Sequence, residues 1–113
     1  MSGGEIKCSR IGQEALDIEK NGKATITGGT IYNDSGGKAI INSGTIKING
    51  ANALVRNRST AKTYATFYVS KDSVKTTFSK GTIQNENSKG YCYVNEDTGG
   101  SKPVSYTHLT LPT

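Results

Sequence analysis

The chain has 113 residues, of which 33% are hydrophobic and 20% are charged, and it contains no tryptophan. A compact globular core normally holds more apolar side chains, and a disordered chain, the alternative for so polar a composition, rarely gathers β-branched residues into short clusters as this one does. The net charge of +5 comes from scattered Lys and Arg, which argues against nucleic-acid binding.

One kind of short alternating segment recurs four times along the chain. Its copies are 4–8, 29–33, 53–57 and 81–85. Each copy begins with a small residue and carries one aliphatic side chain, and that side chain advances in steps of 25, 24 and 28 residues. The alternation predicts strands whose inward residues form one ladder: Ile6, Ile31, Val55 and Ile83.

Two further kinds of segment recur on nearly the same schedule. The second kind occupies 16–19, 39–42, 67–70 and 92–95, and we expect its inward ladder to be Ile18, Ile41, Val69 and Val94. The third kind occupies 24–27, 46–49 and 76–79, with Ile26, Ile48 and Phe78 inward. All are bounded by turn-forming residues and are too short for helices.

Three short strands per repeat predict an all-β fold, a right-handed parallel β-helix of about four coils with 23–28 residues per coil. Such coils stack about 4.8 Å apart, and only stacking can bury their apolar ladders. We expect residues 1–102 to form this β-helix repeat fragment, truncated at one or both ends.

A polar ladder is expected beside the first apolar one. Two residues after each aliphatic position the sequence reads Cys8, Asn33, Asn57 and Asn85. Alternation points these side chains inward, where stacked Asn amides can hydrogen-bond along the column. The alternative reading is N-glycosylation, because 33–35 and 57–59 match the acceptor motif.

The repeats resemble a known group. The phrases at 28–31, 39–46 and 80–83 are similar to repeats of bacterial cell-surface, adhesin-like β-helix proteins with a pectate-lyase-like fold. The resemblance implies export, surface display and a stalk or adhesive role. It implies no catalysis by itself.

No catalytic, cofactor or metal site is expected. A polysaccharide lyase would need clustered carboxylates, and only Asp17 and Glu19 alternate on one strand. Cys8 and Cys92 fall three coils apart, about 14 Å along the axis, which exceeds the reach of a disulfide. We therefore expect both to be thiols that point inward.

Four tyrosines form the candidate binding patch. We expect Tyr64 and Tyr68 to point outward from one strand, and Tyr91 and Tyr93 to point outward from its neighbour in the next coil. Together they would offer an aromatic surface for a glycan or a partner protein. The alternative is an ordinary outer ladder of tyrosines, which favour strands, without any ligand.

The last residues of the chain do not follow the repeat pattern. Residues 104–113 resemble one reading frame of a transposase adapter used in sequencing libraries, which reproduces all ten residues. We therefore expect 103–113 to be an artefactual, unstructured tail, and the natural chain to continue beyond Lys102 with a different sequence.

Two hypotheses for function follow. The first is a structural or adhesive repeat segment of an exported bacterial surface protein, at the cell surface or extracellular, whose partners are neighbouring repeats of the same parent chain and a cell-surface glycan or host surface. The second is a fragment of a carbohydrate-active β-helix, either a polysaccharide lyase or a phage-tail-type glycan binder. No stretch approaches the roughly 18 apolar residues that a membrane span needs, and the first ten residues lack the apolar core of a signal peptide, so we expect any export signal to lie outside this sequence.

Overall fold

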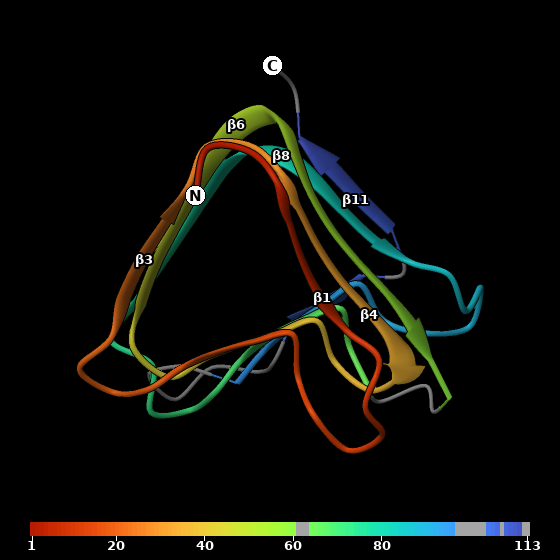
Figure 1. Cartoon of the computed structure of the whole chain (residues 1–113). Coiled ribbons are helices and arrows are strands. Elements are labelled where there is room, and N and C mark those ends of the chain that lie inside the picture. The colour runs from red at the N-terminus through yellow and green to blue at the C-terminus, as the bar shows by residue number, and fades with distance from the viewer. Residues whose placement is uncertain (61–63, 97–103, 107, 112–113) are drawn as a thin grey trace.

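The chain winds into a parallel β-solenoid of about four turns, as the repeats predicted. A computed structural model describes residues 1–60, 64–96, 104–106 and 108–111. Viewed along the axis, the turns superimpose as a triangle whose three sides are stacked strands (Figure 1). The described residues contain no helix, and therefore none that is long and apolar enough to cross a membrane.

Two hydrogen-bonded sheets make up the three sides. The larger has the order β1-β4-β6-β8-β11, with β3 also paired to β6, and the smaller has the order β10-β9-β7-β5-β2. The long strands β6 and β8 bend over the apex in Figure 1 and so belong to two sides. The strands are β1 (Glu5–Cys8), β2 (Leu16–Ile18), β3 (Lys23–Ile26), β4 (Thr30–Gly36), β5 (Ile40–Asn42), β6 (Thr45–Ser59), β7 (Phe67–Val69), β8 (Lys75–Asn85), β9 (Tyr93–Asn95), β10 (Val104–Tyr106) and β11 (His108–Leu111).

Two of the three predicted apolar ladders are confirmed by the pairing of the strands. Parallel pairing places four residues of the first ladder in one column: Ile6, Ile31, Val55 and Ile83. The third ladder, Ile26, Ile48 and Phe78, is also in register. Ile31, Val55 and Ile83 are at most 1% exposed, and each such burial contributes about 1.5–3 kcal/mol, so the columns replace a globular core.

The second predicted ladder is wrong at two of its four positions. Its column consists of Ile18, Asn42, Val69 and Asn95, so Ile41 and Val94 lie one residue out of place. Both stack on the outer face, in a column with Asp17 and Tyr68. Because side chains alternate along a strand, a slip of one residue moves them to the opposite face.

Asn42 replaces the expected aliphatic residue because the interior offers its amide partners. Its Nδ2 donates to the carbonyl of Lys75 at 3.1 Å and to Thr76 Oγ1 at 2.9 Å. Its Oδ1 accepts from the backbone N–H of Gly44 at 3.0 Å. A buried amide with three hydrogen bonds avoids the penalty of an unsatisfied polar group.

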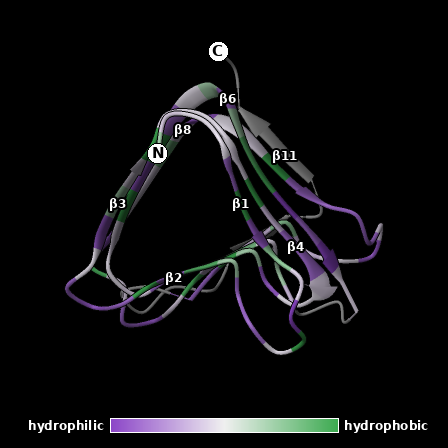
Figure 2. Ribbon diagram, in the orientation of Figure 1, coloured by the Kyte–Doolittle hydropathy of each residue, from purple (hydrophilic) through white to green (hydrophobic). Residues whose placement is uncertain are grey.

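Glycines allow the close approaches at the corners. Gly29 has a φ of +90°, a conformation that favours glycine, at the small-residue position that precedes β4. Gly50 lies where β6 bends, and a Cβ there would come within 1.9 Å of the Thr27 carbonyl oxygen in the turn before. Hydrophobic and hydrophilic residues alternate along the strands, and hydrophilic residues gather in the loops at the lower corners (Figure 2).

The expectation of an unstructured tail is wrong for residues 104–106 and 108–111. They form β10 and β11, which pair antiparallel with β9 and β8. The last turn of a solenoid presents a row of backbone N–H and C=O groups at its edge, and a chain that folds back can satisfy them. The proposed boundary near residue 102 lies outside the described residues.

Candidate functional site

The predicted asparagine column exists, but its hydrogen bonds differ from those we expected. Asn33, Asn57 and Asn85 are in register with Cys8, and the three amides are at most 7% exposed. They do not bond to one another as predicted. Each amide instead donates to backbone carbonyls of two successive loops at the same corner.

The bonds of the three asparagines repeat from turn to turn. Each Nδ2 donates to one carbonyl of its own turn and to one of the preceding turn. The acceptors are Lys38 and Gln13 for Asn33 (2.7 Å each), Tyr64 and Gly37 for Asn57 (3.2 and 2.9 Å), and Tyr91 and Tyr64 for Asn85 (3.0 and 3.4 Å). The column therefore joins the stacked loops of one corner, and we refer to Asn33, Asn57 and Asn85 as the asparagine ladder.

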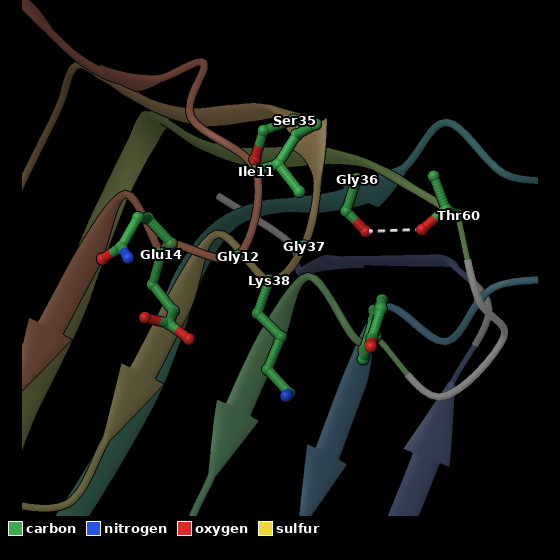
Figure 3. Close-up of a pocket in the computed structure, with 10 residues that line it drawn as sticks. Ile11, Gly12, Glu14, Ser35, Gly36, Gly37, Lys38 and Thr60 are labelled. Atoms are coloured by element: carbon green, nitrogen blue, oxygen red, sulfur yellow. Dashed lines mark hydrogen bonds between the residues drawn. The ribbon is translucent and has the colours of Figure 1, made fainter.

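An open pocket of about 390 Å³ lies at the corner that the asparagine ladder supports. Three successive loops line it, so it exists only because the turns stack. The lining residues are Ile11, Gly12, Gln13, Glu14, Ser35, Gly36, Gly37, Lys38, Thr60 and Tyr64. Glu14 and Lys38 extend from neighbouring loops toward the same side (Figure 3).

The ladder holds the backbone of this pocket in place. Four of its lining residues accept hydrogen bonds from the Nδ2 of Asn33 or Asn57 at their backbone carbonyls: Gln13, Gly37, Lys38 and Tyr64. A fifth contact closes the rim, since Thr60 donates its backbone N–H and its hydroxyl to the Gly36 carbonyl, at 3.0 and 3.3 Å (Figure 3). These bonds fix the walls before any ligand arrives.

An aromatic cluster adjoins the pocket. The Lys38 ammonium lies 5.2 Å from the centre of the Tyr64 ring and 5.0 Å from that of Tyr68. Each cation–π contact at such a surface contributes about 0.5–1 kcal/mol. Tyr68 donates its hydroxyl to Glu96, and burial, together with this hydrogen bond, raises the pKa of Tyr68 to about 12.

The predicted outward orientation of Tyr93 is wrong. Tyr93 pairs with Phe67 and points inward, with the ring centres 5.5 Å apart, against the core. Val94, and not a tyrosine, is the neighbour of Tyr68 in the outer column. Tyr91 is half-buried. The aromatic cluster at the pocket therefore consists of the exposed Tyr64 and the half-buried Tyr68, with the Lys38 ammonium near both rings, and whether it binds a ligand stays a prediction.

A charged network covers the outside of the β1, β4, β6 and β8 side. Glu86 Oε1 lies 3.0 Å from Arg56 Nε, and Glu86 Oε2 lies 3.5 Å from Arg58 Nε. A hydrogen bond from Tyr32, followed by the two guanidinium groups, lowers the pKa of Glu86 despite its partial burial. Arg56 also lies 5.4 Å from the centre of the Tyr32 ring. The charges of this network are already engaged with one another.

The remaining candidates form no reactive group. Cys8 is half-buried, Cys92 is fully buried, and both are thiols. Asp17 and Glu19 are exposed. Within the residues that the structure describes, no three His, Cys, Asp or Glu side chains gather in a way that could hold a metal ion.

Comparisons with known proteins found no family model, no curated protein and no solved structure that matches this chain. The arrangement of the site therefore has to be interpreted from its own chemistry.

Sequence reasoning missed the pocket, although a signal was present: the segments that follow the cysteine and asparagine positions differ in length from repeat to repeat. Variable loops on a regular scaffold are where binding sites concentrate.

Proposed function

We propose that the chain is a structural and adhesive repeat segment of an exported bacterial surface protein, without catalytic activity. The observation that supports this proposal best is the vertical register of its columns. Each turn buries its apolar side chains only against its neighbours, so the unit can be extended by further turns and can hold loops at fixed positions on its surface.

The first turn supports neighbouring repeats as the partners of this segment. Ile6, Leu16 and Ala24 are only partly buried, whereas their counterparts one turn later, Ile31, Ile40 and Ile46, are at most 1% exposed. Strands β1 and β2 also lie at the outer edges of their sheets. A preceding turn of the same kind would cover these side chains and pair with these edges.

Surface display with an adhesion assay tests the proposal. The chain would be fused to an export signal and an outer anchor on a non-adherent bacterium, and attachment to surfaces coated with cell-wall or mucosal glycans would be counted. We expect attachment by the native chain and its loss in Ile31→Asp, which places a charge in the apolar column. The matched control is Val74→Asp, because Val74 is 60% exposed and lies outside the pocket. Equal attachment with and without the displayed chain would overturn the proposal.

A second candidate, a fragment of a carbohydrate-active β-helix, is favoured by the corner pocket. A polysaccharide lyase would need clustered carboxylates to hold calcium beside a basic residue, and the lining of the pocket, as far as the structure describes it, contains one carboxyl group, that of Glu14. Incubating the purified chain with the same glycans separates the two candidates. Release of soluble sugar products would favour an enzyme over the adhesive segment.

A further inference from the structure

We propose that the corner pocket binds one uncharged pyranose unit of a glycan, with Tyr64 as its apolar wall and with Glu14 and Lys38 as its main hydrogen-bonding groups. This inference rests on the proposed adhesive function and names the class of ligand. The volume of the pocket, about 390 Å³, lies at the small end of the range of about 300–1,000 Å³ that ligand pockets occupy.

The charges of the lining favour a neutral ligand. Glu14 carries one negative charge and Lys38 one positive charge, and the other polar side chains, Gln13, Ser35 and Thr60, are neutral. An anionic sugar attracted to Lys38 would be repelled by Glu14, and a cationic sugar would meet the reverse. Adjacent hydroxyl groups suit both residues, since one hydroxyl donates to the carboxylate while another accepts from the ammonium.

The apolar part of the lining matches the C–H face of a sugar ring. Tyr64 is 41% exposed, so one side of its ring remains accessible beside its contact with Lys38. Ile11 lies at the rim and is 87% exposed. A pyranose has hydroxyls around its edge and C–H groups on its faces, so it pairs with polar side chains and an aromatic ring at the same time.

The asparagine ladder lowers the cost of binding. The backbone of Gln13, Gly37, Lys38 and Tyr64 is already tied to Asn33 and Asn57. The ammonium of Lys38 is also restrained between two rings. Binding of a ligand therefore has to order few groups. The loss of conformational entropy on binding is smaller than it would be for flexible loops, so the affinity is higher.

Titration of the full chain with methyl glycosides, followed by backbone amide NMR spectra, tests the inference. The probes are methyl glucoside, methyl galactoside and methyl mannoside, with D-glucuronate as the charged counterpart. We expect at least one neutral glycoside to shift the amide signals of Gly12, Gly37 and Lys38, and D-glucuronate to bind more weakly. Lys38→Met keeps the stem that covers the rings and removes the ammonium, and it should weaken binding about tenfold, as expected for loss of a hydrogen bond to a charged group.

Two further variants complete the design. Tyr64→Ser should abolish the shifts, whereas Lys47→Met, at an exposed position on the outer face of β6, should leave them unchanged. Shifts that persist in both Lys38→Met and Tyr64→Ser, the absence of any shift at tens of millimolar glycoside, or tighter binding of D-glucuronate would overturn the inference. If adhesion of the displayed chain survives Tyr64→Ser, the proposed function stands while the pocket inference fails.

Discussion

Two columns of side chains run side by side through the interior, and they stabilise the solenoid in different ways. The apolar column of Ile31, Val55 and Ile83 excludes water and makes no directional bond. Two residues further along the same strands, the asparagine ladder is equally buried but bonds to the loops of its own turn and of the turn before. The first column stabilises stacking in general, and the second determines the shape of one corner.

The difference between the two columns explains why the pocket lies where it does. The corner beside the asparagine ladder has loops whose carbonyls are fixed from inside, and it carries the pocket and the aromatic cluster. A column of aliphatic residues in the same place would leave those carbonyls without partners, at a cost of about 1–3 kcal/mol for each buried group. The amides therefore specify a structure that apolar packing alone would not.

Replacing one member of the ladder should have the largest effect. In Asn57→Leu, three hydrogen bonds are lost: the Gly37 carbonyl loses its bond from the amide, and the Tyr64 carbonyl and the Thr66 hydroxyl each lose one of two bonds. We expect the free energy of unfolding in urea to fall by about 4 kcal/mol. Amide hydrogen exchange should also accelerate in the pocket loops. The control is Asn52→Leu, at an exposed position of the same strand, and equal stability of the two variants would contradict this role.

Truncation in the apolar column should have a smaller and more evenly spread effect. Ile83 is fully buried, so Ile83→Ala removes apolar contacts and leaves a cavity. We expect a loss of about 3 kcal/mol, measured by the same denaturation, without selective exchange in the corner loops. Val74→Ala, at a residue that is 60% exposed, should change stability by less than about 0.5 kcal/mol. Faster exchange confined to the corner would show that the two columns do not act separately.

Extending the ladder by one turn should give a modest gain. Cys8 occupies the first position of the column and donates its thiol weakly to the Arg10 carbonyl at 3.7 Å. An amide in its place can donate more strongly to the carbonyls of the 9–13 loop. We expect Cys8→Asn to raise the free energy of unfolding by about 0.5–1 kcal/mol, seen as a higher midpoint temperature of thermal unfolding. Cys8→Ser is the size-matched control, and an Asn variant that is less stable than the Ser variant would contradict the account.

The smallest expected effect is a change of stability with pH, which comes from Tyr68 on the outer surface. The pKa of Tyr68 is raised from 10.0 to about 12 in the folded chain, so folding favours the protonated hydroxyl. This contribution is complete below pH 10 and is lost as the pH rises through 12. The pKa of Tyr32 is also raised, by its hydrogen bond with Glu86, so alkaline titration followed by tyrosinate absorbance should show late ionisation that is reduced in Tyr68→Phe by the contribution of one tyrosine. A normal ionisation of Tyr68 would contradict its hydrogen bond to Glu96.

The architecture could be predicted from the sequence wherever each repeat carries residues that align without ambiguity. A small residue, an aliphatic residue and a residue of the asparagine column recur at fixed offsets, and this column was predicted in register. The segment 39–42 contains two adjacent isoleucines, Ile40 and Ile41, so either alternation places an isoleucine inward. Only the partners of the Asn42 amide decide which isoleucine faces inward, and those partners come from the next turn.

The site was less predictable for a related reason. Its residues come from three loops that are far apart in the sequence and meet only once the turns stack. We expected Tyr93 to point outward because side chains alternate and Val94 was assigned to the inward ladder, yet Tyr93 packs in the interior beside Phe67. The pairing of β10 and β11 with the last turn had no counterpart in the repeat pattern at all.

The most direct test of the central claim is a measurement of distances between backbone protons of neighbouring turns by NMR. The account predicts nuclear Overhauser contacts of the parallel type that connect the strand around Ile31 to that around Val55, and the latter to that around Ile83. Contacts of the antiparallel type between these strands, or none at all, would contradict it.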